Sequence, residues 1–201
     1  MILSELVKLY DRMSQDEEFK DTLPTLGRSN QNISFEVVLD KQGNLVDVYD
    51  AKVTKTLPPL KKGGKEKVMQ VAREVIVPGG AHPPGAAATP RFLWDTSAYM
   101  LGYYTEKSKK KDKDKTKARE VLFPAYRDYH KCFRDKYQIQ NAGLDSVCAF
   151  LENWNPNSIS DDIRQKLEQY ADNFGLFRLE GETKYVFDSP DILAAWDREF
   201  A

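Results

Sequence analysis

Histidine and cysteine are scarce in this chain of 201 residues, which contains two of each. Cys132 and Cys148 do not form a Cys-x-x-Cys pair, so the sequence predicts neither a disulfide framework nor a zinc site. We expect both to be buried thiols, because unpaired cysteine behaves as a small apolar residue. Two histidines and two distant cysteines also make a poor ligand set for a transition metal, and we predict no metal site.

Long apolar runs are absent as well. No stretch of about eighteen apolar residues occurs, and the N-terminal MILSELVKLYDRM lacks the basic region of a secretory signal. The sequence therefore predicts no membrane span and a cytoplasmic location. The formal net charge of −1 excludes a global positive field that would draw the whole protein onto DNA. Lysine is nevertheless clustered at residues 61–67 and 106–119, so a polyanion would meet only part of the surface.

Catalytic signatures are also missing. The sequence has no Gly-x-Ser-x-Gly elbow and no complete phosphate-loop or dinucleotide glycine pattern. His130 falls in a tyrosine-rich helical segment, which favours a packed or surface position over a catalytic one. His82 falls in a Pro/Gly-rich loop, where a general base would be poorly preorganised but a contact with a ligand stays open. We predict a protein with no catalytic residues and no cofactor.

Hydrophobic periodicity divides the first half of the chain into elements. Apolar residues at helical spacing predict an amphipathic helix over residues 2–13. Two alternating segments rich in β-branched residues, 32–40 and 45–53, flank a KQGN turn and predict a β-hairpin. A third strand is expected over residues 72–78, followed by a loop to residue 90 that is rich in Pro, Gly and Ala.

The aromatic stretch RFLWDTSAYMLGY, residues 91–103, follows this loop. Asp95 has the character of a helix N-cap, Trp94 and Tyr99 can form a hydrophobic staple, and Gly102 is a natural stop. A short capped helix is therefore expected. We predict that the large apolar side chains lie in the core and hold the base of the loop while its tip is free; they are Phe92, Leu93, Trp94, Tyr99 and Leu101.

The second half is predicted to be mainly helical. Apolar stripes predict helices over residues 119–137 and 144–154, and a Ser158–Asp161 capping box opens a third helix that Gly175 ends. Residues 176–188 predict a small hairpin that turns at Glu180–Gly181–Glu182, and Ser189–Pro190 begins a last helix. The fold class is therefore α+β: a small antiparallel β-sheet with flanking helices, followed by a mainly helical half with a small hairpin.

The lysine-rich segment 107–117 is polar throughout and is expected to be a mobile loop. It separates an α+β part, residues 1–106, from a mainly helical part, residues 118–201. With 41% hydrophobic residues, the chain has enough apolar side chains to bury a core.

Two polar segments are candidates for ligand binding. Residues 27–34, GRSNQNIS, carry an arginine and three carboxamides, and a carboxamide presents a donor and an acceptor side by side, as base-edge recognition requires. The four lysines around Gly63 and Gly64 suit phosphates. The alternative for the first segment is a simple polar turn, and for the second a solvated charge cluster.

Several segments occur in the order found in one known family. They are MILSELVKLYDRM, ISFEVVLDKQGNLVDVYD, a strand ending in VP before a Gly/Pro loop, RFLWDTSAYMLGY and FLENWNP, of which FLWDTSAYMLG is the most specific. The chain resembles the N-terminal part of the large subunit of the subtype I-C CRISPR interference complex, Cascade. The resemblance covers nearly all of the chain and implies a single N-terminal domain of a longer protein. One departure is the loop GGAHPPGAAATP, where many relatives carry basic residues.

The resemblance implies an RNA-guided role in antiviral defence. In such complexes the guide RNA reads the target by base pairing, and the protein reads a short flanking duplex, the protospacer-adjacent motif or PAM. The implied partners are the double-stranded DNA target, the other Cascade subunits with their guide RNA, a helicase-nuclease and viral anti-CRISPR proteins, with no membrane and no catalysis. The candidate DNA contacts are then Arg28, Asn30, Gln31, Asn32, Lys61, Lys62, Lys65, Lys67, Gly79 and Gly80.

Two other functions stay open on the residues alone. One is a hydrolase or transferase whose site is split between the halves, with His82, His130 and an aspartate converging. The other is a pure assembly or interaction module, because exposed tyrosines and lysines also serve protein partners.

Overall fold

Strand β1 (Arg28–Leu39) organises the main sheet of the protein. The computed structural model describes residues 2–17, 19, 23–58, 66–80, 89–105 and 112–199. The second half of β1 pairs antiparallel with β2 (Leu45–Asp50) and parallel with β7 (Phe174–Leu179). Its first half pairs antiparallel with β5 (Arg73–Pro78), and β6 (Trp94–Thr96) pairs with β7. The strand order is therefore β2–β1–β7–β6, with β5 added on β1.

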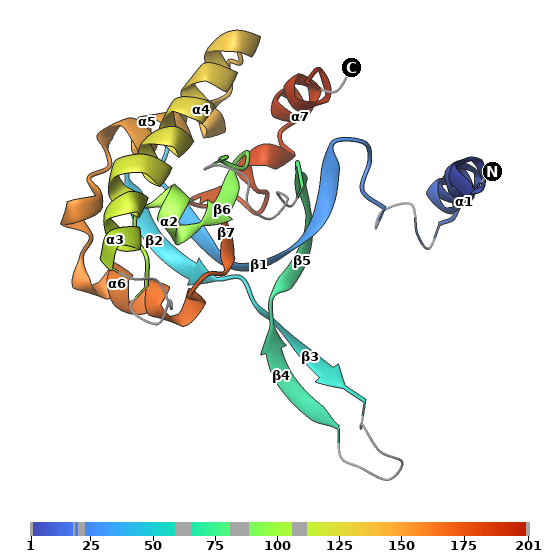
Figure 1. Ribbon diagram of the computed structural model, residues 1–201, viewed down its shortest axis with the longest axis horizontal. Helices are drawn as coiled ribbons and strands as arrows, with labels where there is room; N and C mark the ends of the chain where they lie inside the picture. Colours follow the sequence, from blue (N-terminus) through green and yellow to red (C-terminus); the bar gives the residue numbers. More distant parts are fainter. Residues whose placement is uncertain are drawn as a thin grey trace.

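A two-stranded arm, β3 (Val53–Leu57) and β4 (Lys67–Val71), projects from this sheet (Figure 1). The partner of β1 changes from β2 to β5 at this point, since Phe35 pairs with Asp50 and Ile33 with Arg73. The chain leaves the sheet after β2, forms the arm and returns as β5. The arm is therefore rooted in the middle of β1.

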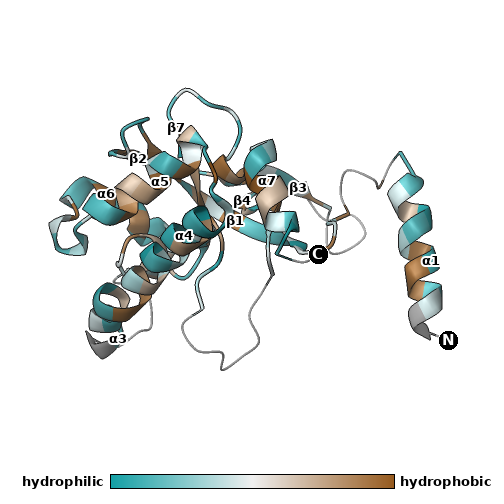
Figure 2. Ribbon diagram, turned by 90° about the horizontal axis from the view of Figure 1, so that it is seen from above, coloured by the Kyte–Doolittle hydropathy of each residue, from teal (hydrophilic) through white to brown (hydrophobic). Residues whose placement is uncertain are grey.

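Helices gather on one side of the sheet in Figure 1, and the two parts of the chain share one core. Core side chains come from both sides of segment 107–117, among them Phe35, Trp94, Phe133, Phe150 and Phe177. The helices are α1 (Ile2–Gln15), α2 (Ser97–Met100), α3 (Asp112–Lys117), α4 (Phe123–Tyr137), α5 (Ala142–Asn153), α6 (Asp161–Leu167) and α7 (Pro190–Asp197). Helix α1 lies apart from the rest, with an apolar stripe visible in Figure 2.

The predicted α+β class is confirmed, as are the first helix, the β1–β2 hairpin and the helical second half. The sheet is mixed rather than antiparallel, because β7 returns from the second half to lie parallel to β1. Strand β7 is the first strand of the hairpin predicted over 176–188. The second predicted strand is reduced to one bridge, Arg178 to Tyr185, and a 3-10 turn at Val186–Asp188 follows it.

Three predicted helix boundaries were wrong. Asp95 lies in β6 with its side chain fully buried, and α2 begins after Thr96. Ser160, rather than Ser158, caps α6 by accepting a hydrogen bond from the backbone N of Ile163. Gly175 lies in β7, where an added Cβ would be 2.1 Å from the Phe35 ring, so the ring rather than a helix end requires glycine there.

Two further expectations need correction. Residues 112–117 are not a loop: they form α3 and continue through a π-helical turn, η1 (Ala118–Leu122), into α4. Residues 107–111 lie outside the described residues. Cys148 is buried as predicted, and burial raises the pKa of its thiol to about 11, but Cys132 is exposed. Cys132 lies two residues beyond the buried His130, on a part of α4 that faces away from the core.

His130 is packed in the core, as its sequence context predicted. Its Nε2 accepts a hydrogen bond from the backbone N of Leu93 at 2.9 Å, and its Nδ1 donates to the carbonyl oxygen of Tyr126 at 2.7 Å. The first bond holds Leu93 at φ 64°, a left-handed conformation that is costly for a residue with a Cβ. Burial lowers the pKa of His130 to about 4, so the imidazole is neutral at pH 7.

This histidine predicts a dependence of stability on pH. Its folded pKa of about 4 lies below the ordinary value of 6.5, so the stabilisation is complete above pH 6.5 and is lost as the pH falls toward 4. A His130→Gln variant lacks this titration. The difference in free energy of unfolding between wild type and variant should therefore shrink by about 2 kcal/mol between pH 7 and pH 5.

Urea denaturation at the two pH values measures this difference. Asp95, whose pKa burial raises to about 6, is present in both proteins, so its own titration cancels. A difference that stays constant between the two pH values would contradict a neutral buried imidazole.

Candidate nucleic-acid interface

The segment GRSNQNIS forms strand rather than the polar turn that was its alternative. Arg28 to Ile33 pair antiparallel with Pro78 to Arg73, and Asn30 lies opposite Ile76. This pairing brings the first candidate segment next to Gly79 and Gly80, which directly follow β5. Six of the ten predicted contact residues therefore lie together: Arg28, Asn30, Gln31, Asn32, Gly79 and Gly80.

Asn30 and Asn32 lie on one face of β1, because side chains two apart on a strand point the same way. Both side chains are exposed. Gln31 points to the other face, where its Nε2 donates to Ser29 Oγ at 3.0 Å. Beside Asn30 is a hollow of about 490 Å³, which is also lined by β5 residues, Tyr185 and Asp188. Arg73 donates to Tyr185 Oη at 3.0 Å within it. The exposed carboxamides thus border a shallow polar surface.

Helix α7 fixes the start of β1. Arg28 donates through one guanidinium nitrogen to both carboxylate oxygens of Asp197, at 2.7 and 2.9 Å, and the Trp196 indole donates to the carbonyl oxygen of Gly27 at 2.7 Å. The same carbonyl accepts from the backbone N of Gly79, whose φ of 82° favours glycine. Arg28 and Gly79 are therefore held in place by partners within the protein.

The aromatic stretch holds both ends of the loop between β5 and β6. The Trp94 indole donates to the carbonyl oxygen of Pro78 at 2.7 Å, at the start of the loop. At its end, buried Asp95 accepts from the backbone N of Arg91 at 3.1 Å and from its guanidinium at 2.9 Å. Phe92, Leu93, Trp94 and Leu101 are fully buried and Tyr99 is partly buried, which confirms the predicted core positions. Residues 81–88, including His82, lie outside the described residues.

The segment that contains the arm carries one of the two lysine clusters of the chain. Residues 52–71 contain six lysines and one glutamate, a net charge of +5. Lys55 and Lys67 share one face of the ribbon, because Lys55 pairs with Met69 and Lys67 with Leu57. Of the four predicted phosphate contacts, Lys67 lies on β4, whereas Lys61, Lys62 and Lys65 fall outside the described residues.

Sequence reasoning missed the arm itself and Lys55. The alternating segments VTKTL and KVMQV on either side of a Pro/Gly-rich turn carried the signal for a hairpin. A two-stranded ribbon of this kind fits the major groove of DNA. The arm therefore extends the candidate interface beyond the β1–β5 pair.

The sequence matches one known protein family. A family profile described as CRISPR-associated protein (Cas_Csd1) matches residues 6–201, nearly the whole chain. The chain belongs to this family. No curated protein matches the sequence. Membership confirms the coarser part of the sequence prediction, a CRISPR-associated protein.

Three further observations concern groups of metal ligands, the position of His130 and the lengths of the helices. Among the described residues, no three His, Cys, Asp or Glu side chains are grouped so that they could hold a metal ion. His130, one member of the proposed split site, has both ring nitrogens engaged in the core and does not reach the surface. None of the described helices combines the length and the apolar character needed to cross a bilayer.

Trp94→Phe should loosen the loop base specifically. The variant keeps an aromatic ring but leaves the buried carbonyl oxygen of Pro78 without its donor, which costs about 1–3 kcal/mol of stability. Exchange of the neighbouring Gly79 amide, measured by hydrogen–deuterium exchange with NMR detection, should accelerate. Trp154→Phe is the matched control, since the Trp154 indole donates to the carbonyl oxygen of Leu101 at 3.0 Å, away from this loop. Equal acceleration at Gly79 in both variants would contradict the assignment.

Proposed function

We propose that this CRISPR-associated chain belongs to the large subunit of an RNA-guided interference complex of the subtype I-C kind and engages the target duplex beside the PAM. The observation that carries the proposal is the position of two exposed carboxamides on a strand from whose middle a lysine-rich ribbon projects. The strand and the ribbon that leaves it therefore offer groups suited to base edges and groups suited to phosphates. The resemblance adds recruitment of the helicase-nuclease, a cytoplasmic location and viral anti-CRISPR proteins as further partners.

The carboxamides support the reading of bases. Asn30 and Asn32 stand on a strand that is hydrogen-bonded on its β5 side, so their backbone positions are fixed before DNA binds. A fixed backbone reduces the entropy that is lost on binding. Asparagine can form paired hydrogen bonds with adenine in the major groove and can also bind minor-groove acceptors.

The arm supports the binding of phosphates. Lys55 and Lys67 lie on a ribbon that leaves the sheet and whose side chains are mostly exposed, so they can contact a duplex that lies against β1. Lysine neutralises phosphate without reading sequence, and its contribution weakens as salt concentration rises. Arg28 supports this function indirectly in our proposal, because its pairing with Asp197 ties the start of β1 to α7.

An assembly role is the second candidate, and helix α1 favours it. Leu6 and Val7 are more than half exposed, and Leu9 and Tyr10 also face solvent. An exposed apolar stripe on an amphipathic helix suits a contact with another protein subunit. This role is compatible with duplex engagement, because α1 takes no part in the β1–β5 pair.

Base reading and phosphate binding predict different responses to substitution. Asn30→Ala or Asn32→Ala should reduce the preference of the assembled complex for PAM over non-PAM duplex, by about 1–3 kcal/mol per lost base contact. Lys55→Ala or Lys67→Ala should weaken both duplexes alike and reduce the dependence of log affinity on log salt by about one per lysine. Affinities for both duplexes, measured at several salt concentrations, separate the two effects.

Matched controls come from exposed residues elsewhere in the chain. Asn153→Ala on α5 and Lys41→Ala in the β1–β2 turn should leave both the PAM preference and the salt dependence unchanged. If every carboxamide variant keeps the wild-type PAM preference, base reading by β1 is wrong.

We also propose that the chain is not an enzyme. The purified protein should neither cleave DNA or RNA nor hydrolyse ATP, with or without Mg²⁺, because the sequence carries no nucleophile or nucleotide-hydrolysis motif. Nuclease and phosphate-release assays test this. Turnover that is lost in a His82→Ala variant of unchanged melting temperature would instead support the split-site hydrolase or transferase.

A further inference from the structure

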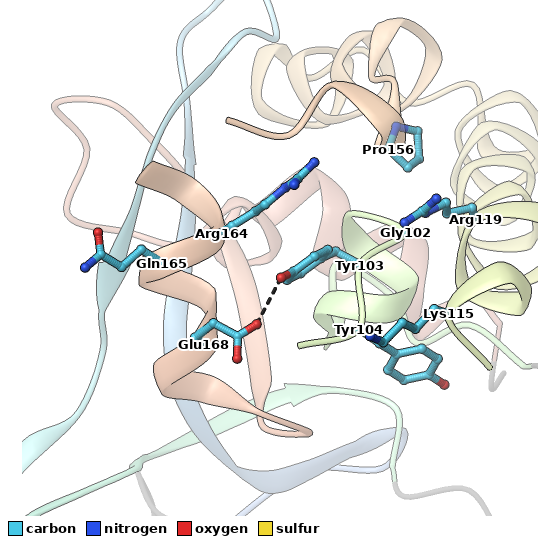
Figure 3. Close-up of a pocket in the computed structure, with 9 residues that line it drawn as sticks. All are labelled: Gly102, Tyr103, Tyr104, Lys115, Arg119, Pro156, Arg164, Gln165 and Glu168. Atoms are coloured by element: carbon cyan, nitrogen blue, oxygen red, sulfur yellow. Dashed lines mark hydrogen bonds between the residues drawn. The ribbon is translucent and has the colours of Figure 1, made fainter. Parts of the chain in front are cut away.

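A second hollow, away from the β1–β5 surface, combines cationic and aromatic side chains (Figure 3). Its volume is about 350 Å³, within the range of pockets that hold small ligands. Helix α6 and the following 3-10 turn form one side, and the end of α2, α3 and η1 form the other. The side chains that matter are Tyr103, Tyr104, Lys115, Arg119, Arg164 and Glu168.

Arg119 and Arg164 make the hollow attractive to an anion. They approach it from opposite sides in Figure 3. Arg119 donates to the neutral carboxamide of Asn157 at 3.2 Å, which leaves its charge uncompensated by that bond. Arg164 lies 3.9 Å from the carboxylate of Asp161, beyond hydrogen-bonding distance, and that carboxylate is fully exposed, so water screens the attraction.

Specific local contacts fix the walls of the hollow. Gly102 has φ 66°, and an added Cβ would lie 2.8 Å from the Pro156 ring, so only glycine allows this close approach. The next residue, Tyr103, is held by a hydrogen bond from Ser97 Oγ to its carbonyl oxygen at 2.8 Å. Arg119 lies in the π-helical turn η1, a rare departure from α-helix that is frequent at functional sites.

The side chains favour a nucleotide over a simple anion. Arginine presents a planar fork that matches phosphate oxygens, and two arginines on opposite sides can hold one phosphate between them. Tyr104 supplies an aromatic ring of the kind on which a base stacks. Tyr103 Oη donates to Glu168 at 2.9 Å, which places polar groups within reach of a base edge.

We propose that this pocket binds a phosphate-bearing nucleotide unit, with the phosphate between Arg119 and Arg164 and the base against Tyr104. The site is independent of the duplex contacts proposed above, because its residues belong to other elements than β1, β5 and the arm. The unit is either a free nucleotide or one residue of a single strand, and the test below separates these two sources.

Fluorescence anisotropy with a labelled four-nucleotide thymidine strand tests the proposal on the 201-residue protein. Arg119→Gln and Arg164→Gln should each weaken binding about tenfold, as expected for loss of a charge-assisted hydrogen bond. Tyr104→Ala should weaken it about fivefold or more, and Tyr104→Phe, which keeps the ring, should restore it. The three positions are exposed or half-buried, so the melting temperature should stay near the wild-type value.

Two control variants distinguish binding in this pocket from general charge attraction and from binding to the arm. Arg127→Gln removes an exposed arginine of α4 outside the pocket and should leave affinity unchanged. The Lys55→Ala, Lys67→Ala double variant should also bind the short strand normally, so a failure of the duplex proposal would not affect this result. An equal loss in Arg127→Gln and in the pocket variants would overturn the proposal.

Competition identifies the ligand. Displacement of the strand by thymidine monophosphate at equal affinity supports a free nucleotide, whereas displacement only by longer strands supports a nucleotide within a chain. Inorganic phosphate that competes as well as the monophosphate, together with no effect of Tyr104→Ala, would overturn nucleotide binding. Displacement by a tetraglutamate peptide at equal affinity would do the same, because it would indicate a site for acidic protein segments.

Discussion

The buried hydrogen bonds of residues 93–95 are the constraint on which the candidate DNA surface depends. Leu93 binds α4 through His130, Trp94 binds the end of β5, and Asp95 binds Arg91. Trp94 and Asp95 are consecutive residues of β6, so their side chains point to opposite faces, whereas Leu93 precedes the strand with a left-handed φ and donates through its backbone N. A short segment can therefore reach a helix, a strand end and a loop end at once, and the cost of the strained residue is offset by bonds that water cannot replace.

The same end of β5 is held a second time from the far end of the chain. Trp196 and Asp197 of α7 bind Gly27 and Arg28, and Gly27 in turn accepts from Gly79. Two indole donors thus bind the backbone carbonyls of Gly27, just before β1, and of Pro78, at the end of β5. The carboxamides of β1 stand on a backbone that has lost its freedom before any ligand arrives, which is what discrimination between bases requires.

The local elements were predictable from the sequence, and the long-range contacts were not. Alternation of β-branched residues identified the β1–β2 hairpin, and the apolar stripe identified α4, because these signals lie within one segment. Gly175 was taken for a helix end because the Phe35 ring that requires it lies 140 residues away. Asp95 was taken for an N-cap because an acidic residue before a helical stretch usually is one, and only the neighbouring Arg91 explains its burial.

The candidate site shows the same division. Residue types alone suggested which side chains suit DNA, but only the pairing of β1 with β5 places Asn30 and Asn32 on the strand whose start lies beside Gly79. The lysine cluster was visible in the sequence, whereas the place of Lys67 on a projecting ribbon depends on the register between β3 and β4. The pocket between α6 and η1 had no sequence signal, because its arginines come from segments 45 residues apart and a π-helical turn has no clear sequence pattern.

The uneven distribution of charge would orient a nucleic acid that approaches the protein. Because the whole chain carries −1 and residues 52–71 and 107–117 carry +5 each, the remainder carries −11. In the proposed function, a polyanion would be attracted to these two segments and repelled by the remaining surface, which would orient the encounter without strong attraction overall. Such a protein gains little non-specific affinity from its charge, since few phosphates are neutralised at once. Discrimination between bases would then be left to β1, whose middle bears the arm and whose start lies beside the hydrogen bonds of Trp94 and Trp196.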